Sequence, residues 1–339
     1  MIRSRSAAPA TAGFSLVELM LALTLGLGLV LGMVAIQQQG SRLSRNVATA
    51  GRLQDAARLA LGVIEADLRM ANHWGLHSRA DWITNRAQPG DPLPAPFSSA
   101  QGDRISVCGG ADSHWAIHLE QYVEGSNGSY GLACVATGGS RPGSDTLVVR
   151  RAADTAPASL DPQRIYVQSR RTQGVLFVPQ AGCTNPSQAA CLPAGYAPGS
   201  SQSRALLARA YYVSPNSTQR PGLPALRRKS LGNVNSASVG GAMTDEELVA
   251  GIEDLQVRFG VDTDGDASLD EYVEPGALPA GARVVAATVW VRVRAEDAEP
   301  GHVDDTRYRY AGMTADWVAG DAYRRILVSR TIQLRNTRP

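Results

Sequence analysis

Five oxygen-bearing side chains occupy every second position of one short segment near the C-terminal end of the sequence. They are Asp262, Asp264, Asp266, Ser268 and Asp270. A hard cation such as Ca²⁺ binds several oxygen ligands at once, and this spacing allows one loop to bring them together. Asp and Gly are also ordinary turn residues. The segment therefore predicts either a calcium site or a solvated Asp/Gly hairpin turn.

The same segment follows the first nine positions of an EF-hand calcium loop and then departs from it. Ala267 stands where an EF-hand has an obligatory glycine, and Val273 stands where it has a bidentate glutamate. Pro275 and Gly276 disfavour the helix that would follow. Both alternatives therefore stay open. No other motif requires a cofactor, so calcium is the one candidate.

Histidines supply the other candidate metal ligands. His73 with His77, and His114 with His118, have a four-residue spacing that could face one metal ion on a helix. Neither pair carries the glutamate of an HExxH motif, so we interpret them as surface or core histidines. The sequence also lacks a GxSxG motif, a Walker loop and a dinucleotide-binding fingerprint. We therefore predict that the protein is not an enzyme.

Cysteine chemistry is expected to be structural. The four cysteines are Cys108, Cys134, Cys183 and Cys191, and no two of them form a CxxC pair. This disfavours zinc and redox motifs, and favours disulfides if the chain leaves the cytoplasm. We expect Cys183 to pair locally with Cys191, and Cys108 with Cys134. Mixed pairs and free thiols are the alternatives.

An apolar run of about 23 residues, from Phe14 to Ile36, is long enough to cross a membrane as a helix. Glu18 is its one charged residue, and Arg3 and Arg5 precede it. By the positive-inside rule the N-terminus stays in the cytoplasm. A carboxylate within a bilayer is costly, which predicts a partner for Glu18. The alternative is that Glu18 reaches the interface of a plain signal anchor.

A secretory signal has its small residues after the apolar segment, whereas here Gly13 comes before it. That order resembles a prepilin leader, in which a glycine is followed by the cut and then by Phe-[Ser/Thr]-Leu-[Ile/Val]-Glu-Leu. The matching residues here are Gly13, Phe14, Ser15, Leu16, Val17, Glu18 and Leu19. The segments ADLRMANHWG at 66–75 and GVDTDGD at 260–266, and the C-terminal Leu334, Arg335 and Asn336, resemble the PilW family of type IV minor pilins.

This resemblance implies a minor pilin that prepilin peptidase cleaves between Gly13 and Phe14 and that is methylated on Phe14. Glu18 would pair with the free amino group of a neighbouring subunit. The partners would be other minor pilins and the major pilin, through the N-terminal helix, and the inner-membrane assembly platform. The protein would cross the inner membrane once, with its head in the periplasm, and then reach the pilus and the cell surface.

The resemblance further implies incorporation at or near the pilus tip, to prime assembly and support twitching motility or adhesion by the fimbria. Two alternatives stay open. One is a J-type pseudopilin of type II secretion, and the other is an adhesive subunit that binds a ligand through loops of residues 76–243. The net charge of only +2 gives no reason to expect nucleic acid as a partner.

The elements that must position these residues form an α+β fold. Apolar residues continue at three- and four-residue steps to about Ala71, which predicts one long N-terminal helix packed on an antiparallel β-sheet head with long loops. We divide the chain into a leader (1–13), a transmembrane and assembly helix (14–36), the periplasmic half of the helix (37–75) and a β-rich head (76–339).

Strands within the head are predicted from short β-like runs bounded by turn residues. The predicted strands are 104–108, 115–123, 146–150, 164–168, 175–178, 205–213, 284–295 and 324–336. Thr244 and Glu247 have the spacing of a capping box, so we expect a short helix there before a strand through Phe259. Frequent turns agree with 34 glycines and 19 prolines.

Overall fold

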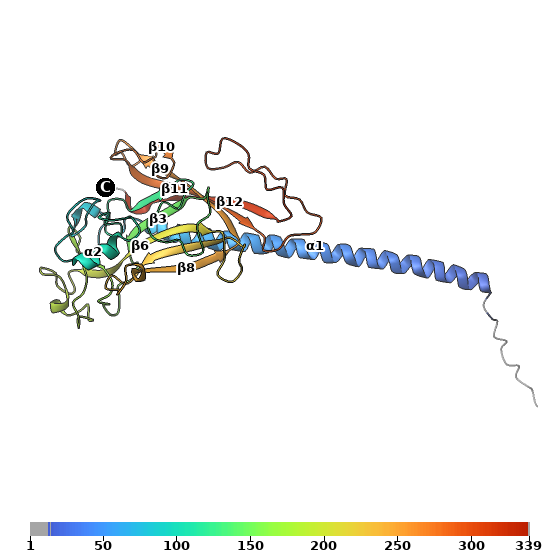
Figure 1. Ribbon diagram of the computed structural model, residues 1–339, viewed down its shortest axis with the longest axis horizontal. Helices are drawn as coiled ribbons and strands as arrows, with labels where there is room; N and C mark the ends of the chain where they lie inside the picture. The colour runs from blue at the N-terminus through green and yellow to red at the C-terminus, as the bar shows by residue number, and fades with distance from the viewer. Residues whose placement is uncertain (1–12, 14, 338–339) are drawn as a thin grey trace, which may run out of the picture. The chain divides into compact units, whose positions relative to one another are not determined.

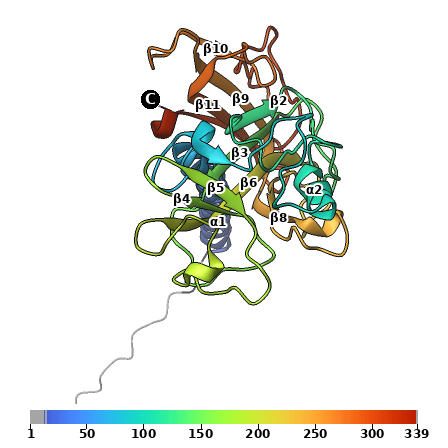
Figure 2. The same ribbon diagram turned by 90° about the vertical axis from the view of Figure 1, so that its left-hand side faces the viewer.

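The computed structural model describes Gly13 and residues 15–337. The chain divides into two compact units, with the boundary between Arg52 and Leu53. A long N-terminal helix and a large, mainly antiparallel β-structure make up the described residues, so the predicted α+β class is confirmed. The elements can be followed by colour in Figure 1 and from a second direction in Figure 2.

Helix α1 runs from Leu16 to Met70 and contains 55 residues. Large apolar side chains of its first half are exposed, with Leu29 at 77%. In its second half, apolar residues spaced three or four apart lie in the core of the globular unit. These are Leu53, Ala57, Ala60, Leu61, Ile64 and Leu68. The predicted helix is therefore confirmed, and its apolar stripe is buried from Leu53 onward, whereas Leu43 and Val47 are exposed.

The larger sheet has eight strands among the described residues. They are β1 (Ile83–Thr84), β2 (Val123–Ser126), β3 (Thr146–Ala152), β4 (Tyr166–Ser169), β5 (Gly174–Phe177), β6 (Gln202–Ser214), β7 (Ala225–Leu231) and β8 (Met243–Ala250). The path is β1-β5-β4-β6-β3-β2, and only β1 and β5 pair in parallel. The long strand β6 pairs with β3, β4 and β7, which makes it the centre of the sheet.

The smaller sheet has the order β10-β9-β11-β12, and all of its pairs are antiparallel. Its strands are β9 (Ile252–Asp262), β10 (Glu271–Val273), β11 (Arg283–Arg294) and β12 (Arg325–Gln333). The prediction that the two closing segments of the sequence form strands is confirmed, and these strands pair with each other. Apolar residues of both sheets and of α1 form one continuous core.

Three sequence-based predictions of local structure are wrong. Residues 104–108 lie at the end of helix α2 (Ser99–Ser106) and just beyond it. Ser98 caps this helix in a capping box with Gln101, a local signal that outweighs the β-like composition. In the run 115–123 only Val123 belongs to a strand. Buried Arg150 donates to the carbonyls of Trp115 and Gln121. In this run, hydrogen bonds from a side chain therefore take the place of the backbone hydrogen bonds between strands.

The third error concerns the predicted short helix at 244–250, which is strand β8. Here β8 pairs with β7, and the acids 245–247 stand opposite the bases 227–229. Lys229 and Arg227 both pair with Asp245, and Arg228 pairs with Glu246. Cross-strand pairs of opposite charge stabilise a sheet. Partners that are distant in sequence therefore decide the conformation of this segment.

Short 3-10 turns complete the described secondary structure. They are Ala80–Trp82, Ala189–Cys191, Gly240–Ala242 and Arg335–Thr337. Two disulfides join Cys108 to Cys134 and Cys183 to Cys191, which is the expected pairing.

Candidate functional site

The first half of α1 carries the membrane and assembly features that the sequence predicts. Among the described residues, this is the one helix that is long and apolar enough to cross a membrane, with a mean hydropathy of 2.5 in its most apolar window. Its leucines, valines and methionines are exposed in the single chain. Exposed apolar surface of this extent is unfavourable in water. The segment therefore needs lipid or another protein around it.

Glu18 lies in the first turn of α1 and is exposed. No ion pair links it to another described residue. Its position at the N-terminal end of the helix favours a negative charge, because the helix dipole is positive there. Gly13 is exposed too, whereas Phe14 lies outside the described residues. Cleavage after Gly13 and methylation of Phe14 therefore stay predictions.

Asp67, near the other end of α1, is a buried acid that the sequence reasoning did not single out. It is 2% exposed. Its Oδ1 accepts from Arg151 at 3.0 and 2.8 Å and from Arg209 at 2.8 Å, and its Oδ2 accepts from the Tyr211 hydroxyl at 2.6 Å. The helix dipole disfavours an acid at a C-terminal end. Two guanidinium groups from β3 and β6 offset this, so Asp67 ties the helix to the sheet.

The end of α1 is closed by the segment 66–75 that resembles the PilW family. Asn72 adopts a left-handed conformation with φ of 61°, which stops the helix. Its side chain accepts from the buried Trp74 indole at 2.7 Å and donates to the carbonyl of Asn336 at 2.8 Å. The Asn336 amide in turn donates to the carbonyls of Arg69 and Ala71. The C-terminal segment therefore caps the helix.

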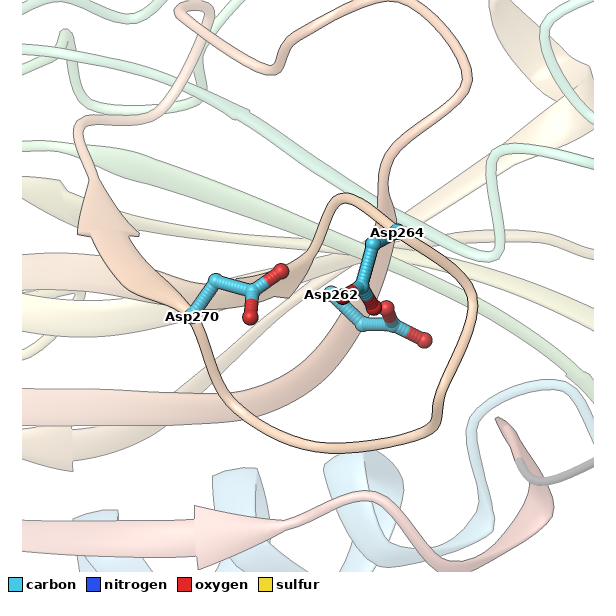
Figure 3. Close-up of side chains that lie close together, drawn as sticks. All are labelled: Asp262, Asp264 and Asp270. Carbon is cyan, nitrogen blue, oxygen red and sulfur yellow. The ribbon is translucent and has the colours of Figure 1, made fainter.

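The acidic segment forms the hairpin turn between β9 and β10 (Figure 3). Asp262 is the last residue of β9 and is buried, while Asp264 and Asp270 are exposed. One carboxylate oxygen from each of these three residues lies within 4.8 Å of the others, so the turn could hold a cation. Asp266 is not part of this group of carboxylates, and Ser268 donates its backbone N–H to Asp266 at 2.7 Å.

Hydrogen bonds within the turn shape it. Asp262 accepts from the backbone N–H groups of Gly265 at 2.7 Å and Ala267 at 3.0 Å. Ala267 has a φ of 66°, the left-handed conformation that an EF-hand gives to its glycine. Hydrogen bonds from Ser268 and from Thr263 lower the pKa of Asp266 and of Asp270, respectively. The hairpin alternative describes the backbone correctly, and calcium binding stays a prediction.

A second buried ionic network lies where residues 295–324 connect β11 to β12. Arg325 donates to Glu253 at 2.7 Å and to Asp321 at 2.6 Å, and Arg292 lies 3.7 Å from the ring centroid of Trp317. Burial alone raises the pKa of Glu253, but Arg325 and Arg292 outweigh it and lower that pKa. Sequence reasoning missed this network because its members are far apart along the chain.

The histidine pairs do not share a helix face. His114 has a φ of 49° and donates from Nε2 to the carbonyl of Asp91 at 2.6 Å, and the run around it is irregular. Burial lowers the pKa of His73, His77 and His118. No described group of three or more potential metal-ligating side chains contains a histidine.

Comparison with known proteins gives one match. Residues 210–336 match the family model described as type IV pilus-assembly protein W. This range begins within β6 and contains β7 to β12, so it includes the acidic hairpin, the Glu253 network and the capping Asn336. No curated protein and no solved structure matches the chain.

Proposed function

We propose that the chain is a minor pilin, because residues 210–336 match the family model described as type IV pilus-assembly protein W. In this role prepilin peptidase removes residues 1–13, Phe14 becomes the methylated N-terminus, and α1 enters the filament at or near its tip. The observation that carries this proposal is the exposed apolar half of α1, with one acid in its first turn. A helix of this kind suits both storage in a membrane and packing among similar helices.

Glu18 is central to the assembly step. A carboxylate is costly in an apolar environment unless it has a partner, and the described part of this chain provides no ion-pair partner for it. The amino group of Phe14 on a neighbouring subunit would neutralise it when helices stack. Such pairing would set the axial register between subunits, because only one stagger brings the two charges together.

The globular unit supports a place at the tip. Residues 53–339 form one large unit with several long surface loops. A bulky subunit is hard to repeat along a filament without clashes, whereas the tip imposes no neighbour on its outer side. The proposed consequence is that the protein primes assembly, and through assembly supports twitching motility and adhesion.

Processing is tested by intact-mass spectrometry of the purified chain and of the variant Gly13→Val. We expect the native chain to begin at Phe14 and to carry one extra methyl group, while Gly13→Val keeps all 13 leader residues and gives no pili. Gly62→Val is the matched control, because a Cβ added at Gly62 meets nothing within 4 Å. Normal cleavage of Gly13→Val would overturn the proposal.

The pilus role is separated from a role in type II secretion by deleting the gene. We expect loss of surface pili and of twitching, with secreted enzymes at their normal level. The reverse result, normal twitching with lost secretion, would assign the chain to a pseudopilus instead.

A further inference from the structure

A polar groove of about 520 Å³ opens on the globular unit, and its lining residue Arg283 pairs across the sheet with Asp262 of the acidic hairpin. Three segments, within residues 78–88, 118–123 and 278–284, line it together with Asn72 and Thr337. The Tyr122 hydroxyl donates to the carbonyl of Val284 at 3.0 Å and so ties two of these walls together. Residues 278–284 lie within the range that matches the family model, whereas the other two segments precede it. The groove thus combines residues inside and outside the matched range.

His118 is the buried polar residue of this groove that lacks a partner. It is 8% exposed, and no hydrogen bond links its ring to another described residue. Burial and the nearby Arg150 guanidinium lower its pKa, so the ring is neutral at pH 7. A neutral imidazole has one N–H donor and one acceptor nitrogen. Neither ring nitrogen is a fully buried atom without a partner, so both are accessible from the groove and can serve a ligand that donates and accepts.

Glu120 is held in place at the rim of the groove. Its Oε1 accepts from Arg86 at 3.0 Å, and its Oε2 accepts from the side-chain amide of Gln88 at 2.7 Å. Each carboxylate oxygen can accept a further hydrogen bond. A polar group fixed by two others loses little conformational entropy when it binds a ligand. Glu120 is therefore a preorganised acceptor.

Four of the five charges around the groove lie in two ion pairs. Arg79 pairs with Asp81 at 2.6 Å, and Arg86 pairs with Glu120 at 3.0 Å. Arg283 adds one exposed positive charge on the opposite wall. Such a surface has no strong attraction for an anion or a cation, because it presents charges of both signs in pairs. It suits a neutral ligand with many hydrogen-bonding groups.

We propose that this groove binds a neutral saccharide, with His118 and Glu120 hydrogen-bonding its hydroxyl groups. A hydroxyl both donates and accepts, which matches the neutral imidazole beside a fixed carboxylate. Leu278, Pro279 and Ala280 supply apolar surface for the C–H faces of a sugar ring. A peptide main chain could add as a strand only at Val123 of the edge strand β2, since the lining residues within 118–122 and 278–282 lie outside strands. The site does not depend on the proposed assembly role.

Saturation-transfer NMR on the full chain tests the site, in a zwitterionic detergent that contains no sugar. The probes are glucose, galactose and N-acetylglucosamine, with acetylated and amidated tetra-alanine as the peptide probe. We expect transfer to at least one saccharide and none to the peptide. His118→Leu removes both ring nitrogens at similar volume, and Glu120→Gln removes the rim charge. Each should weaken saccharide binding at least about tenfold.

The controls are His302→Leu, outside the groove, and Glu246→Gln, whose carboxylate is paired with Arg228 as that of Glu120 is with Arg86. Both should bind like the native chain. If His118→Leu does not fold, saccharide binding by Glu120→Gln, at the exposed rim, still tests the proposed site. The proposal fails if no saccharide receives saturation, if both groove variants bind normally, or if the peptide binds instead. Glu18→Gln should bind saccharide normally, so failure of the assembly role is a separate result.

Discussion

Two acids on the same helix, Glu18 and Asp67, have opposite surroundings. Glu18 is exposed on an apolar segment and makes no ion pair with a described residue, whereas Asp67 is buried and accepts from Arg151, Arg209 and Tyr211. The helix dipole favours Glu18 at the N-terminal end and disfavours Asp67 near the C-terminal end. Glu18, which the helix dipole favours, has no ion-pair partner among the described residues, whereas Asp67, which the dipole disfavours, has three hydrogen-bond partners.

The two halves of α1 therefore depend on different interactions. The second half is complete within one chain, because β3 and β6 supply cations for its buried charge and a core for its apolar side. The first half is incomplete within one chain. Changes around Asp67 should therefore alter folding, and changes at Glu18 should alter association.

The largest effect is expected from Asp67→Ala. It leaves Arg151 and Arg209 without their shared carboxylate in a buried place, which should lower the free energy of unfolding by about 3–5 kcal/mol. Denaturant unfolding followed by tryptophan fluorescence measures this, since all five tryptophans lie between residues 74 and 317. Asp55→Ala, at an exposed position of the same helix, is the control. Equal stability of Asp67→Ala and Asp55→Ala would show that the partners of Asp67 contribute nothing to folding.

Next in size is the loss of the Cys108–Cys134 disulfide in a double alanine variant. This bond has a sequence separation of 26, against 8 for Cys183–Cys191. Chain-entropy estimates give about 3.5 kcal/mol for the longer loop and about 2.5 kcal/mol for the shorter one. The same unfolding measurement on both double variants should rank them in this order. The reverse order would show that local packing, not loop length, sets the contribution.

Asp262→Asn should lower the free energy of unfolding by about 1–3 kcal/mol. The new amide N–H₂ cannot accept from both Gly265 and Ala267, so one of these two partly buried hydrogen bonds is lost. Asp264→Asn, at an exposed position, should change it by less than about 0.5 kcal/mol. Similar losses in both variants would contradict this account of the turn.

The same pair of variants tests the calcium prediction. Bound calcium would raise the melting temperature of the native chain, and both Asp262→Asn and Asp264→Asn would reduce that rise. An unchanged melting temperature in millimolar calcium would exclude the calcium site and support the alternative of a solvated hairpin turn.

The smallest effect on folding is expected from Glu18→Gln. The carboxylate makes no ion pair with a described residue, so the free energy of unfolding should stay within about 0.5 kcal/mol of the native value. Incorporation into pili should nevertheless be lost, because the charge that would pair with a neighbouring subunit is gone. Fractionation of sheared pili measures this. Normal incorporation would show that Glu18 has no part in assembly.

Two capping-box spacings show how far local sequence predicts local structure. Ser98 and Gln101 form a real capping box at the start of α2, while Thr244 and Glu247 have the same kind of spacing within strand β8. The sequence predicts a strand at 104–108, where α2 ends, and a helix at the start of β8. A capping box contributes about 1 kcal/mol, which several cross-strand ion pairs and a sheet ladder can exceed. The sequence does hold a signal for this strand pair, because the basic residues 227–229 are complementary in charge to the acidic residues 245–247.

The sequence by itself determined the features that depend on neighbours along the chain. These are the long helix, its apolar first half, Gly13 and Glu18, the acidic turn and most central strands, because periodicity, length and turn residues are local properties. Tertiary structure alone decided the partners of Asp67, the network around Glu253, the capping of α1 by Asn336 and the groove at His118. Each of these joins residues distant in sequence, and burial makes their charges and hydrogen bonds depend on which segments meet.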